Sequence, residues 1–348
     1  MTPLTPTRLL SPMICLGIEG TAHTLGIGIV DEKCRVLANE SWMYRPEKGG
    51  IHPRESANAM AENFDDVMKR ALEKSKVNLA EVDCVAFSRG PGLGPCLRTA
   101  ATAARALSLA LRRPLVDVNH CVAHLEIGRA VCKGCRDPVL LYVSGGNSQV
   151  IAFKSGRYRV LGETMDIGLG NMLDKLGREL GMRFPAGPVI EKMALEGKEL
   201  LELPYSVKGM DVAFSGMMTA ALTMARRGAR LEDVLFSVQE TSFAMLCEVA
   251  ERALAHLERN ELLLGGGVVQ NQRLCEMARV MCEDRGARMF VPPASLCRDN
   301  GAMIAWLGLG AFRNGYSIPV SRSGVDQRWR TDEVEAVWRN EKKRTSKR

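Results

Sequence analysis

The chain has 348 residues, of which 46% are hydrophobic and 25% charged, and its net charge is +7. This composition is typical of a globular protein with enough apolar material for two domains of ordinary size, and the positive charge weakly favours a polyanionic partner such as RNA. No apolar run approaches the roughly 20 residues that cross a bilayer, and the eleven scattered cysteines without a secretion signal indicate reduced thiols, so we expect a cytoplasmic protein and disfavour membrane and secreted ones.

The first half of the chain alternates predicted strands and helices. Short apolar runs between glycine and polar residues predict strands within 14–29, with a turn at Gly20, and over 36–43, 82–88 and 114–118. Apolar residues at helical spacing predict helices over 57–75 and 99–111. Residues 89–95 are so rich in glycine and proline that we expect no regular element there.

The second half repeats this alternation. Its predicted strands cover 138–143, 150–153, 158–162, 261–264 and 288–291. Its predicted helices cover 171–181, 231–258, a segment that begins near Gln272, and 300–312. Because each half opens with a β-hairpin whose turn contains glycine and then alternates strands with helices, we expect an α/β protein of two related lobes with a central cleft.

Two of the five histidines stand in the motif His120-Cys-Val-Ala-His124. On a helix, the i, i+4 spacing puts both imidazoles on one face, where they can bind a single metal ion. Asp299, at the start of the last predicted helix, and Tyr142 are candidates for further ligands. The alternative is a pair of core histidines that are satisfied by hydrogen bonds. A zinc-peptidase motif would need a glutamate after the first histidine, and Cys121 occupies that position, so peptidase chemistry is disfavoured.

Three glycine-containing turns follow predicted strands of the two lobes. They are Glu19-Gly-Thr21 in the first half, and Ser144-Gly-Gly-Asn147 and Gly265-Gly-Gly267 in the second. Glycine lets backbone N–H groups approach phosphate oxygens, and a helix N-terminus favours the same anion. Each turn alone is typical of an ordinary tight turn, but the three together indicate a nucleotide site. The phosphate or anion contacts that we expect from them include Glu19, Thr21, Gly265 and Gly266.

Other charged side chains are candidates for ligand contacts. Asp174 and Glu191 could accept hydrogen bonds from ribose or ligand hydroxyls, or could be surface carboxylates of helices. Residues 50–55 contain His52 and Arg54 and are either a capping loop or an anion contact. Cys132-Lys-Gly-Cys135 has the spacing of a zinc knuckle, but no second such pair completes a site, so its role stays open.

Segments spread from Leu16 to Val334 resemble one protein family. They include LGIEGTAHT, GIHPRES, GPGLGPCLR, VNHCVAH, YVSGGNSQV, LLGGGVVQN and CRDNGAMIA. On these segments the chain resembles the universal tRNA threonylcarbamoyladenosine synthase in its archaeal and eukaryotic KEOPS form, once misnamed O-sialoglycoprotein endopeptidase. The resemblance implies the two-lobed actin/Hsp70/sugar-kinase-like (ASKHA) fold. It also implies transfer of a threonylcarbamoyl group from threonylcarbamoyl-adenylate to the N6 amine of the adenosine next to the tRNA anticodon.

The resemblance also assigns residues of the cleft. One divalent metal ion, iron or zinc, would be held by His120, His124, Tyr142 and Asp299. The phosphate and threonylcarbamoyl region of the acyl-adenylate would lie against Tyr142, Val143, Ser144, Gly145 and Gly146. The adenosine portion, or that of another adenine nucleotide, would be held by Asp174, Gly187, Glu191 and Asn271. No residue stands out as a general base.

The implied partners are tRNA and the other subunits of the KEOPS complex, including a small atypical protein kinase and a small dimerising subunit. We expect lobe I over 13–137, lobe II over 138–298, a closing helix and C-terminal segment over 299–334 that returns toward lobe I, and flexible ends over 1–12 and 335–348. Two other functions stay open: an ATP-dependent small-molecule kinase of the same fold, and a non-catalytic nucleotide-binding scaffold. Such kinases usually carry an aspartate in the first-strand motif, where this chain has Glu19.

Overall fold

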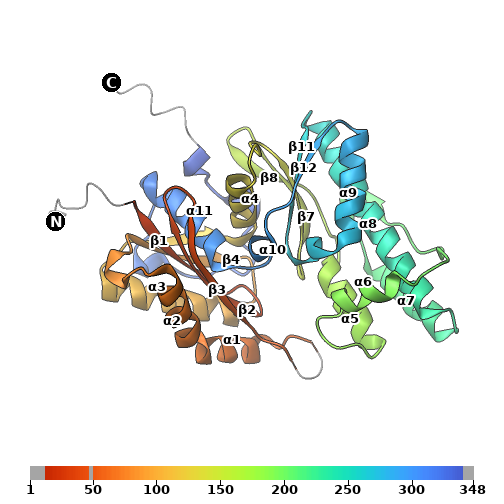
Figure 1. The fold of residues 1–348 in the computed structure, drawn as a ribbon, viewed down its shortest axis with the longest axis horizontal. Helices are drawn as coiled ribbons and strands as arrows, with labels where there is room; N and C mark the ends of the chain where they lie inside the picture. The colour runs from red at the N-terminus through yellow and green to blue at the C-terminus, as the bar shows by residue number, and fades with distance from the viewer. Residues whose placement is uncertain (1–11, 47–49, 340–348) are drawn as a thin grey trace.

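The computed structural model describes residues 12–46 and 50–339. Each half of the chain contains one five-stranded sheet with helices packed on its faces (Figure 1). The segments 1–11 and 340–348, which belong to the ends expected to be flexible, lie outside the described residues. Within the described part, no helix combines the length and the apolar character needed to cross a membrane.

The first sheet has the strand order β3-β2-β1-β4-β5, in which β1 pairs antiparallel with β2 and parallel with β4. Its strands are β1 (Ile14–Glu19), β2 (Thr24–Asp31), β3 (Val36–Met43), β4 (Cys84–Gly90) and β5 (Leu115–Asn119). The helices of this half are α1 (Pro53–Glu62), α2 (Phe64–Ser75), α3 (Gly94–Leu111) and α4 (His120–Val131). Every residue of β1 and β2 is buried, because helices α1 to α3 cover one face of the sheet and α11 (Gly301–Arg313) covers the other.

The second sheet repeats this connectivity in the order β12-β11-β6-β7-β8, in which β6 pairs antiparallel with β7 and parallel with β11. Its strands are β6 (Val139–Val143), β7 (Ser148–Lys154), β8 (Arg157–Glu163), β11 (Glu261–Gly265) and β12 (Arg288–Phe290), and a separate ribbon joins β9 (Val207–Lys208) to β10 (Asp211–Val212). The helices of this half are α5 (Leu169–Glu179), α6 (Gly187–Ala194), α7 (Ser215–Arg226), α8 (Leu231–His256), α9 (Gln272–Asp284) and α10 (Ala294–Cys297). The shared connectivity confirms the predicted α/β fold of two related halves.

The helix predicted over 57–75 is instead two helices, α1 and α2, which meet at Asn63. The backbone of Asn63 has φ −98° and ψ 3°, and its side-chain Nδ2 donates a hydrogen bond to the carbonyl of Ala59 at 2.8 Å. Asparagine often makes such local hydrogen bonds in place of continued helix, which explains the break.

Helix α3 begins at Gly94, inside the segment 89–95 for which the sequence predicts no regular element. Pro95 lies in the first turn of this helix, where the N–H that proline lacks has no intrahelical partner anyway. The proline therefore suits the start of a helix, and the prediction for this segment is wrong at its end. The sequence analysis also missed α6, α7, the short α10 and the ribbon of β9 and β10.

Helix α11 lies directly on the first sheet, because glycines in the helix and in the strand leave no side chains between the helix and the sheet. A Cβ atom at Gly28 of β2 would lie 2.1 Å from the backbone nitrogen of Ala302, and one at Gly301 would lie 2.1 Å from the backbone nitrogen of Gly28. Backbone therefore packs on backbone here. This contact sets the position of the start of α11, and with it the position of the preceding Asp299.

Residues 335–339 belong to the end that the sequence predicts to be flexible, and the structure describes their contacts. They end in a short 3-10 helix over Val337–Arg339, and the Arg339 guanidinium forms an ion pair with Glu126 of α4 at 2.8 Å. Nε1 of Trp338 donates a hydrogen bond to the Tyr158 hydroxyl of β8 at 3.0 Å. Because these partners lie on α4 and β8, the segment is held against both halves of the molecule.

Candidate metal centre and ligand cleft

Helix α4 carries the histidine pair and begins where β5 ends. Asn119 caps the helix, since its side-chain oxygen accepts the N–H groups of Cys121 and Val122 at 3.1 and 3.2 Å. The cap starts the helix at His120, so His120 and His124 lie one turn apart. Both side chains are buried, and their ring centroids are 4.8 Å apart.

Two residues from distant elements meet this pair. Asp299 immediately precedes the N-cap of α11, and its Oδ1 lies 3.3 Å from Nε2 of His120 and 3.5 Å from Nε2 of His124. Tyr142, near the end of β6, has its hydroxyl 2.9 Å from Nε2 of His120. Ligand atoms of the two histidines and of Asp299 all lie within 4.8 Å of one another. The four residues expected to bind metal are therefore brought together from three separate parts of the chain.

His124 has hydrogen-bonding capacity that the described protein does not use. Both of its ring nitrogens are buried, and neither makes a hydrogen bond within the described residues, although Nε2 lies 3.5 Å from Oδ1 of Asp299. An unsatisfied buried polar atom costs about 1–3 kcal/mol, so such a group is expected to serve a ligand or an ion. Two imidazoles, one carboxylate and one phenol are donors that iron and zinc accept. The residues present therefore fit a divalent transition-metal ion.

Glu19, at the end of β1, orients His120. Its Oε2 lies 3.0 Å from Nδ1 of His120, and its Oε1 accepts the N–H and the hydroxyl of Thr21 at 2.7 and 2.6 Å. A hydrogen bond at Nδ1 leaves Nε2 of His120 directed at Asp299 and Tyr142, as a metal ligand requires. Because a buried carboxylate repels phosphate and both of its oxygens are engaged, this geometry favours an orienting role for Glu19 over the anion contact expected from the sequence.

Burial and neighbouring charges move the pKa values of this cluster. Burial lowers the pKa of His124, which favours the neutral ring and with it a free lone pair on one ring nitrogen. Burial also acts to lower the pKa of His120, but Tyr142, Glu19 and Asp299 together raise it well above its ordinary value. Burial acts to raise the pKa of Asp299, but the two histidines hold it well below its ordinary range. Metal binding would therefore compete with a proton on His120.

The turn between β6 and β7 forms the next wall of the site. The first turn of α5 packs on it, with the N–H groups of Gly170 and Asn171 donating to the carbonyls of Ser144 and Gly145 at 3.1 and 2.9 Å. The start of α5 is therefore occupied by protein carbonyls. A Cβ atom at Gly146, by contrast, would meet no atom within 4 Å, so the turn is open to a ligand on that side. The preceding Val143 is fully buried in the core of the second half.

Three residues expected at the adenosine lie around the start of α6. Oδ1 of Asp174, on α5, accepts the N–H of Ala186 at 2.7 Å. Gly187 begins α6, and a Cβ atom there would meet nothing within 4 Å. Glu191 lies one turn further along and accepts the N–H of Gln272 at 2.8 Å. Glu191 also lines a groove of about 370 Å³ between α6 and the start of α9.

Asn271, the fourth residue expected at the adenosine, has a structural role of its own. Its side-chain oxygen caps α9 by accepting the N–H groups of Arg273 and Leu274 at 2.9 and 3.3 Å. Its Nδ2 donates to Oε1 of Gln239, a residue that lines the same groove, at 2.8 Å. Only the second hydrogen of Nδ2 is left for a ligand.

The remaining expected anion contacts divide into two kinds. His52 and Arg54 are exposed at the start of α1, and no hydrogen bond or ion pair among the described residues links them to the histidine pair. Gly265 ends β11 beside the metal ligands, since a Cβ atom there would lie 3.9 Å from Cβ of His124. The N–H of Gly266 donates to the carbonyl of Cys297 at 3.0 Å, so it is not free to bind phosphate as expected.

The sequence analysis missed His23, which lies in the loop between β1 and β2. Its Nδ1 is buried and has no hydrogen-bond partner within the described residues. Its ring meets the ring of Phe184 edge-on, with the centroids 5.8 Å apart. Because Phe184 lies between α5 and α6, this contact joins the two halves across the cleft. The signal in the sequence was a histidine two residues after the Glu19-Gly-Thr21 turn.

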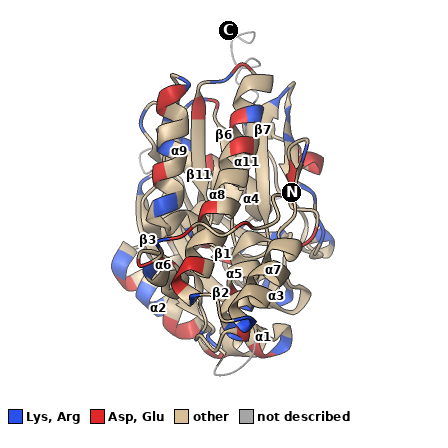
Figure 2. Ribbon diagram, turned by 90° about the vertical axis from the view of Figure 1, so that its right-hand side faces the viewer, with Lys and Arg blue, Asp and Glu red and all other residues tan. Residues whose placement is uncertain are grey.

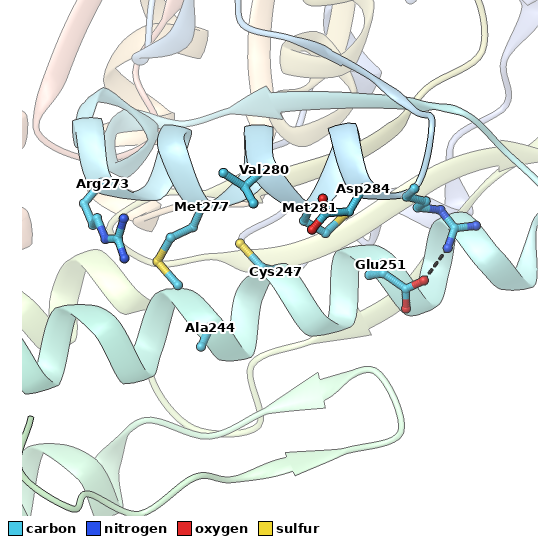
Figure 3. Close-up of a pocket in the computed structure, with 9 residues that line it drawn as sticks. Ala244, Cys247, Glu251, Arg273, Met277, Val280, Met281 and Asp284 are labelled. Atoms are coloured by element: carbon cyan, nitrogen blue, oxygen red, sulfur yellow. Dashed lines mark hydrogen bonds and ion pairs between the residues drawn. The ribbon is translucent and has the colours of Figure 1, made fainter.

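A separate groove of about 720 Å³ lies between α8 and α9. Cys247 and Met277 point into it, and Glu251 pairs with Arg285 at one end (Figure 3). None of the residues expected in the metal or nucleotide site lines this groove, so it is distinct from the cleft.

Solved structures establish the class of fold. HypF from Thermococcus kodakarensis matches with a TM-score of 0.63 at 15% identity, covering 87% of this chain and 48% of that one. Component A of the (R)-2-hydroxyglutaryl-CoA dehydratase from Acidaminococcus fermentans matches with a TM-score of 0.54 at 10% identity, covering 85% and 97%. The chain has the two-lobed actin/sugar-kinase-like (ASKHA) fold, which confirms the expectation from the resemblance.

Sequence comparisons then define the family. The sequence profile described as tRNA N6-adenosine threonylcarbamoyltransferase matches residues 35–306. Proteins of this name from Thermococcus kodakarensis and Archaeoglobus fulgidus are 57% and 56% identical over 327 and 326 residues, which is 94% of this chain and 100% of each relative. A probable bifunctional tRNA threonylcarbamoyladenosine biosynthesis protein from Methanothermobacter thermautotrophicus is 55% identical over 94% of this chain and 61% of its own length. The chain belongs to the tRNA N6-adenosine threonylcarbamoyltransferase family.

Proposed function

We propose that this protein transfers a threonylcarbamoyl group from threonylcarbamoyl-adenylate to the N6 amine of the adenosine next to the tRNA anticodon. The observation that carries the proposal is the convergence of His120, His124, Tyr142 and Asp299 next to the glycine turn that follows β6, in a chain of this family. A small-molecule kinase of the same fold has no use for a buried histidine pair, and the family membership supports the transferase.

His120, His124, Asp299 and Tyr142 would hold one iron or zinc ion. When bound, such an ion neutralises charge that develops on the phosphate leaving group or polarises the carbamoyl carbonyl. The protein prepares the site in advance, because Glu19 orients the His120 ring and the packing of α11 on the first sheet positions Asp299.

The adenylate would extend from the start of α6 to the metal ligands. Asp174 and Glu191 would accept hydrogen bonds from the adenosine portion, and Gly187 leaves space beside it. The open side of the turn at Gly146 would receive the phosphate. Because an exocyclic amine is a weak nucleophile, correct positioning of the two substrates would account for much of the catalysis.

The same proposal implies partners. The adenosine must be splayed out of the anticodon loop to reach the cleft. Charged residues of both signs are interspersed along the outer helices in Figure 2, so the net positive charge forms no single basic field on that face. Other KEOPS subunits, including a small atypical protein kinase and a small dimerising subunit, would then supply part of the RNA-binding surface. We further propose a cytoplasmic location, with lobe I over 13–137, lobe II over 138–298, and 299–334 as the closing segment.

The test is an assay of the full-length protein with threonylcarbamoyl-adenylate and unmodified tRNA, with and without partner subunits, read by mass spectrometry of the nucleosides. We expect modified adenosine with the wild-type protein and only background with His120→Ala. His256→Ala, which changes an exposed histidine at the end of α8, is the matched control and should retain activity. The proposal is contradicted if the wild-type protein with metal and partners leaves the tRNA unmodified, or if His120→Ala is fully active.

A further inference from the structure

The transfer proposed above releases one proton, and none of the residues assigned to the metal or the adenylate accepts it. As the N6 lone pair attacks the carbamoyl carbon, a C–N bond forms and the C–O bond to the phosphate breaks. AMP leaves with the electron pair as a phosphate monoester and needs no proton at neutral pH. The new amide nitrogen, in contrast, must lose a proton. The cleft therefore needs a base close to the reacting carbon.

Most titratable groups of the cleft are already engaged. His120 binds Glu19 through Nδ1 and faces the other metal ligands through Nε2. His124 and Asp299 complete the same cluster. The carboxylate of Asp174 accepts the N–H of Ala186 and lies at the proposed adenosine site.

His23 remains, and three observations point to a role for it. Its Nδ1 is buried without a partner in the described residues, a state that a bound substrate atom would relieve. Its loop is anchored, because its own carbonyl accepts the N–H of Tyr44 at 2.8 Å. Its ring is held edge-on against Phe184 of the opposite half, with the centroids 5.8 Å apart. An imidazole whose Nδ1 lacks a partner in the described residues thus lies where the two halves meet.

Charged groups at both ends of the proposed adenylate act on the His23 ring. Asp299, in the metal cluster, and Asp174, at the adenosine, both act on this ring by their charge. No hydrogen bond or ion pair within the described residues joins His23 to either carboxylate. Burial lowers the pKa of His23, and the two carboxylates offset this effect only in part, so the surroundings favour the neutral ring. A neutral ring is the form that accepts a proton.

We propose that His23 is a catalytic residue of the transfer, and that its Nδ1 accepts the proton that the N6 amine loses. This inference rests on the proposed function. The C–N bond forms as the proton moves to His23, AMP departs, and the imidazolium then releases its proton to solvent. Phe184 acts as a positioning residue, because its ring fixes the orientation of the imidazole across the cleft.

The test compares the wild-type protein with His23→Gln, each full-length, loaded with zinc or iron, and assayed with partner subunits, threonylcarbamoyl-adenylate and tRNA. Glutamine keeps hydrogen-bonding capacity and similar bulk but cannot take up the proton. Since general-base catalysis contributes about 10²–10⁴-fold, we expect kcat to fall by at least about 100-fold. Metal content, adenylate affinity and the thermal midpoint should stay near the wild-type values. His256→Ala is the matched control and should retain kcat.

Two further measurements separate a base from a merely structural residue. The metal site must be kept filled at every pH by excess zinc or iron, because a proton on His120 competes with the metal. Under that condition, the kcat of the wild-type protein should fall toward acid pH as His23 becomes protonated and level off above its pKa, and this acid limb should be missing in His23→Gln. Added imidazole should restore part of the activity of His23→Ala, because the free base can occupy the vacated space.

The possible outcomes are distinct. A kcat for His23→Gln within about threefold of the wild-type value would overturn the inference. Loss of adenylate affinity together with an unchanged pH profile and no rescue by imidazole would also overturn it, since His23 would then only shape the cleft. Absence of modified nucleoside with the wild-type protein, metal and partners would instead contradict the proposed function itself.

Discussion

Nδ1 of His120 lies 3.0 Å from Oε2 of Glu19, although the two residues are 101 positions apart in the chain. Glu19 ends β1 and His120 directly follows β5, and β1, β4 and β5 run parallel in one sheet. Parallel strands bring their carboxyl ends to the same edge, where ligands of α/β proteins commonly bind. The first half of the molecule thus supplies both a metal ligand and the group that orients it.

Glu19→Gln should weaken metal binding while leaving the fold intact. The change removes the charge that holds Nδ1 of His120, and loss of such a supporting contact typically lowers metal affinity by about 10–100-fold. Competition with a chelator of known affinity measures the effect. Glu196→Gln, at an exposed position after α6, is the control and should bind metal as the wild-type protein does. Equal affinities for all three proteins would show that Glu19 does not support the site.

Metal should stabilise the protein through His124. Zinc at 100 times its Kd is expected to add about 2.7 kcal/mol to the free energy of unfolding, which appears as a rise in Tm. His124→Ala removes a buried ligand, so most of this rise should disappear, whereas His256→Ala should keep it. Differential scanning calorimetry with and without metal measures the shifts. The metal centre would be refuted by an undiminished rise in His124→Ala.

Gly28→Ala should destabilise the protein by about 3 kcal/mol, because its Cβ atom would overlap the backbone of Ala302, which cannot move aside like a side chain. Gly216→Ala in helix α7 is the matched control. A Cβ atom there meets nothing within 4 Å, so alanine should stabilise by about 0.5–1 kcal/mol. Denaturant unfolding of both variants gives the two values. Similar changes in the free energy of unfolding for the two variants would mean that α11 packs on β2 less closely than the structure shows.

Gly146→Ala should impair substrate binding without affecting stability. Its Cβ atom meets no protein atom but would enter the space proposed for the phosphate. We expect KM for threonylcarbamoyl-adenylate to rise about tenfold, which corresponds to about 1.4 kcal/mol. Gly324→Ala, at another open and exposed glycine, should leave KM unchanged. A wild-type KM for Gly146→Ala would exclude this turn from the phosphate site.

Arg339→Ala should destabilise the protein by about 2–3 kcal/mol, because Glu126, only 2% exposed, would lose one of its two cationic partners. Arg330→Ala removes an exposed ion pair with Asp332 and should cost less than about 1 kcal/mol. Urea unfolding monitored by circular dichroism compares the two. If Arg339→Ala were no more damaging than Arg330→Ala, the end of the described chain would contribute little to the fold.

The predictions from sequence were best where the controlling contacts are local. The strand 36–43 was predicted with its observed bounds, and the spacing of His120 and His124 correctly indicated two rings one helical turn apart. The break at Asn63 was missed because the side chain of one residue ended a helix whose apolar period continues beyond it. The spacing of apolar residues therefore predicts the period of a helix well, but it does not predict where a single side-chain contact ends that helix.

His23 illustrates what local reasoning cannot reach. Nδ1 of His23 has no hydrogen-bond partner in the described residues because the fold buries it. The ring of His23 contacts Phe184, which is far away in the sequence. Glu19 was likewise expected at a phosphate because its neighbours form a glycine turn, whereas its partner His120 belongs to another element. Glycine turns look alike in a sequence whether or not their N–H groups are already engaged.

The order of amino acids alone determined the alternation of strands and helices, the two-lobed α/β class and the imidazole pair on one helical face, because hydrophobic period and i, i+4 spacing act over a few residues. Only the tertiary structure decided that Asp299 reaches those imidazoles, that Glu19 holds one of them, and that Nδ1 of His23 has no hydrogen-bond partner in the described part of the chain. These relationships arise from parallel strand pairing and from backbone packing at glycines, which join segments that no local pattern connects.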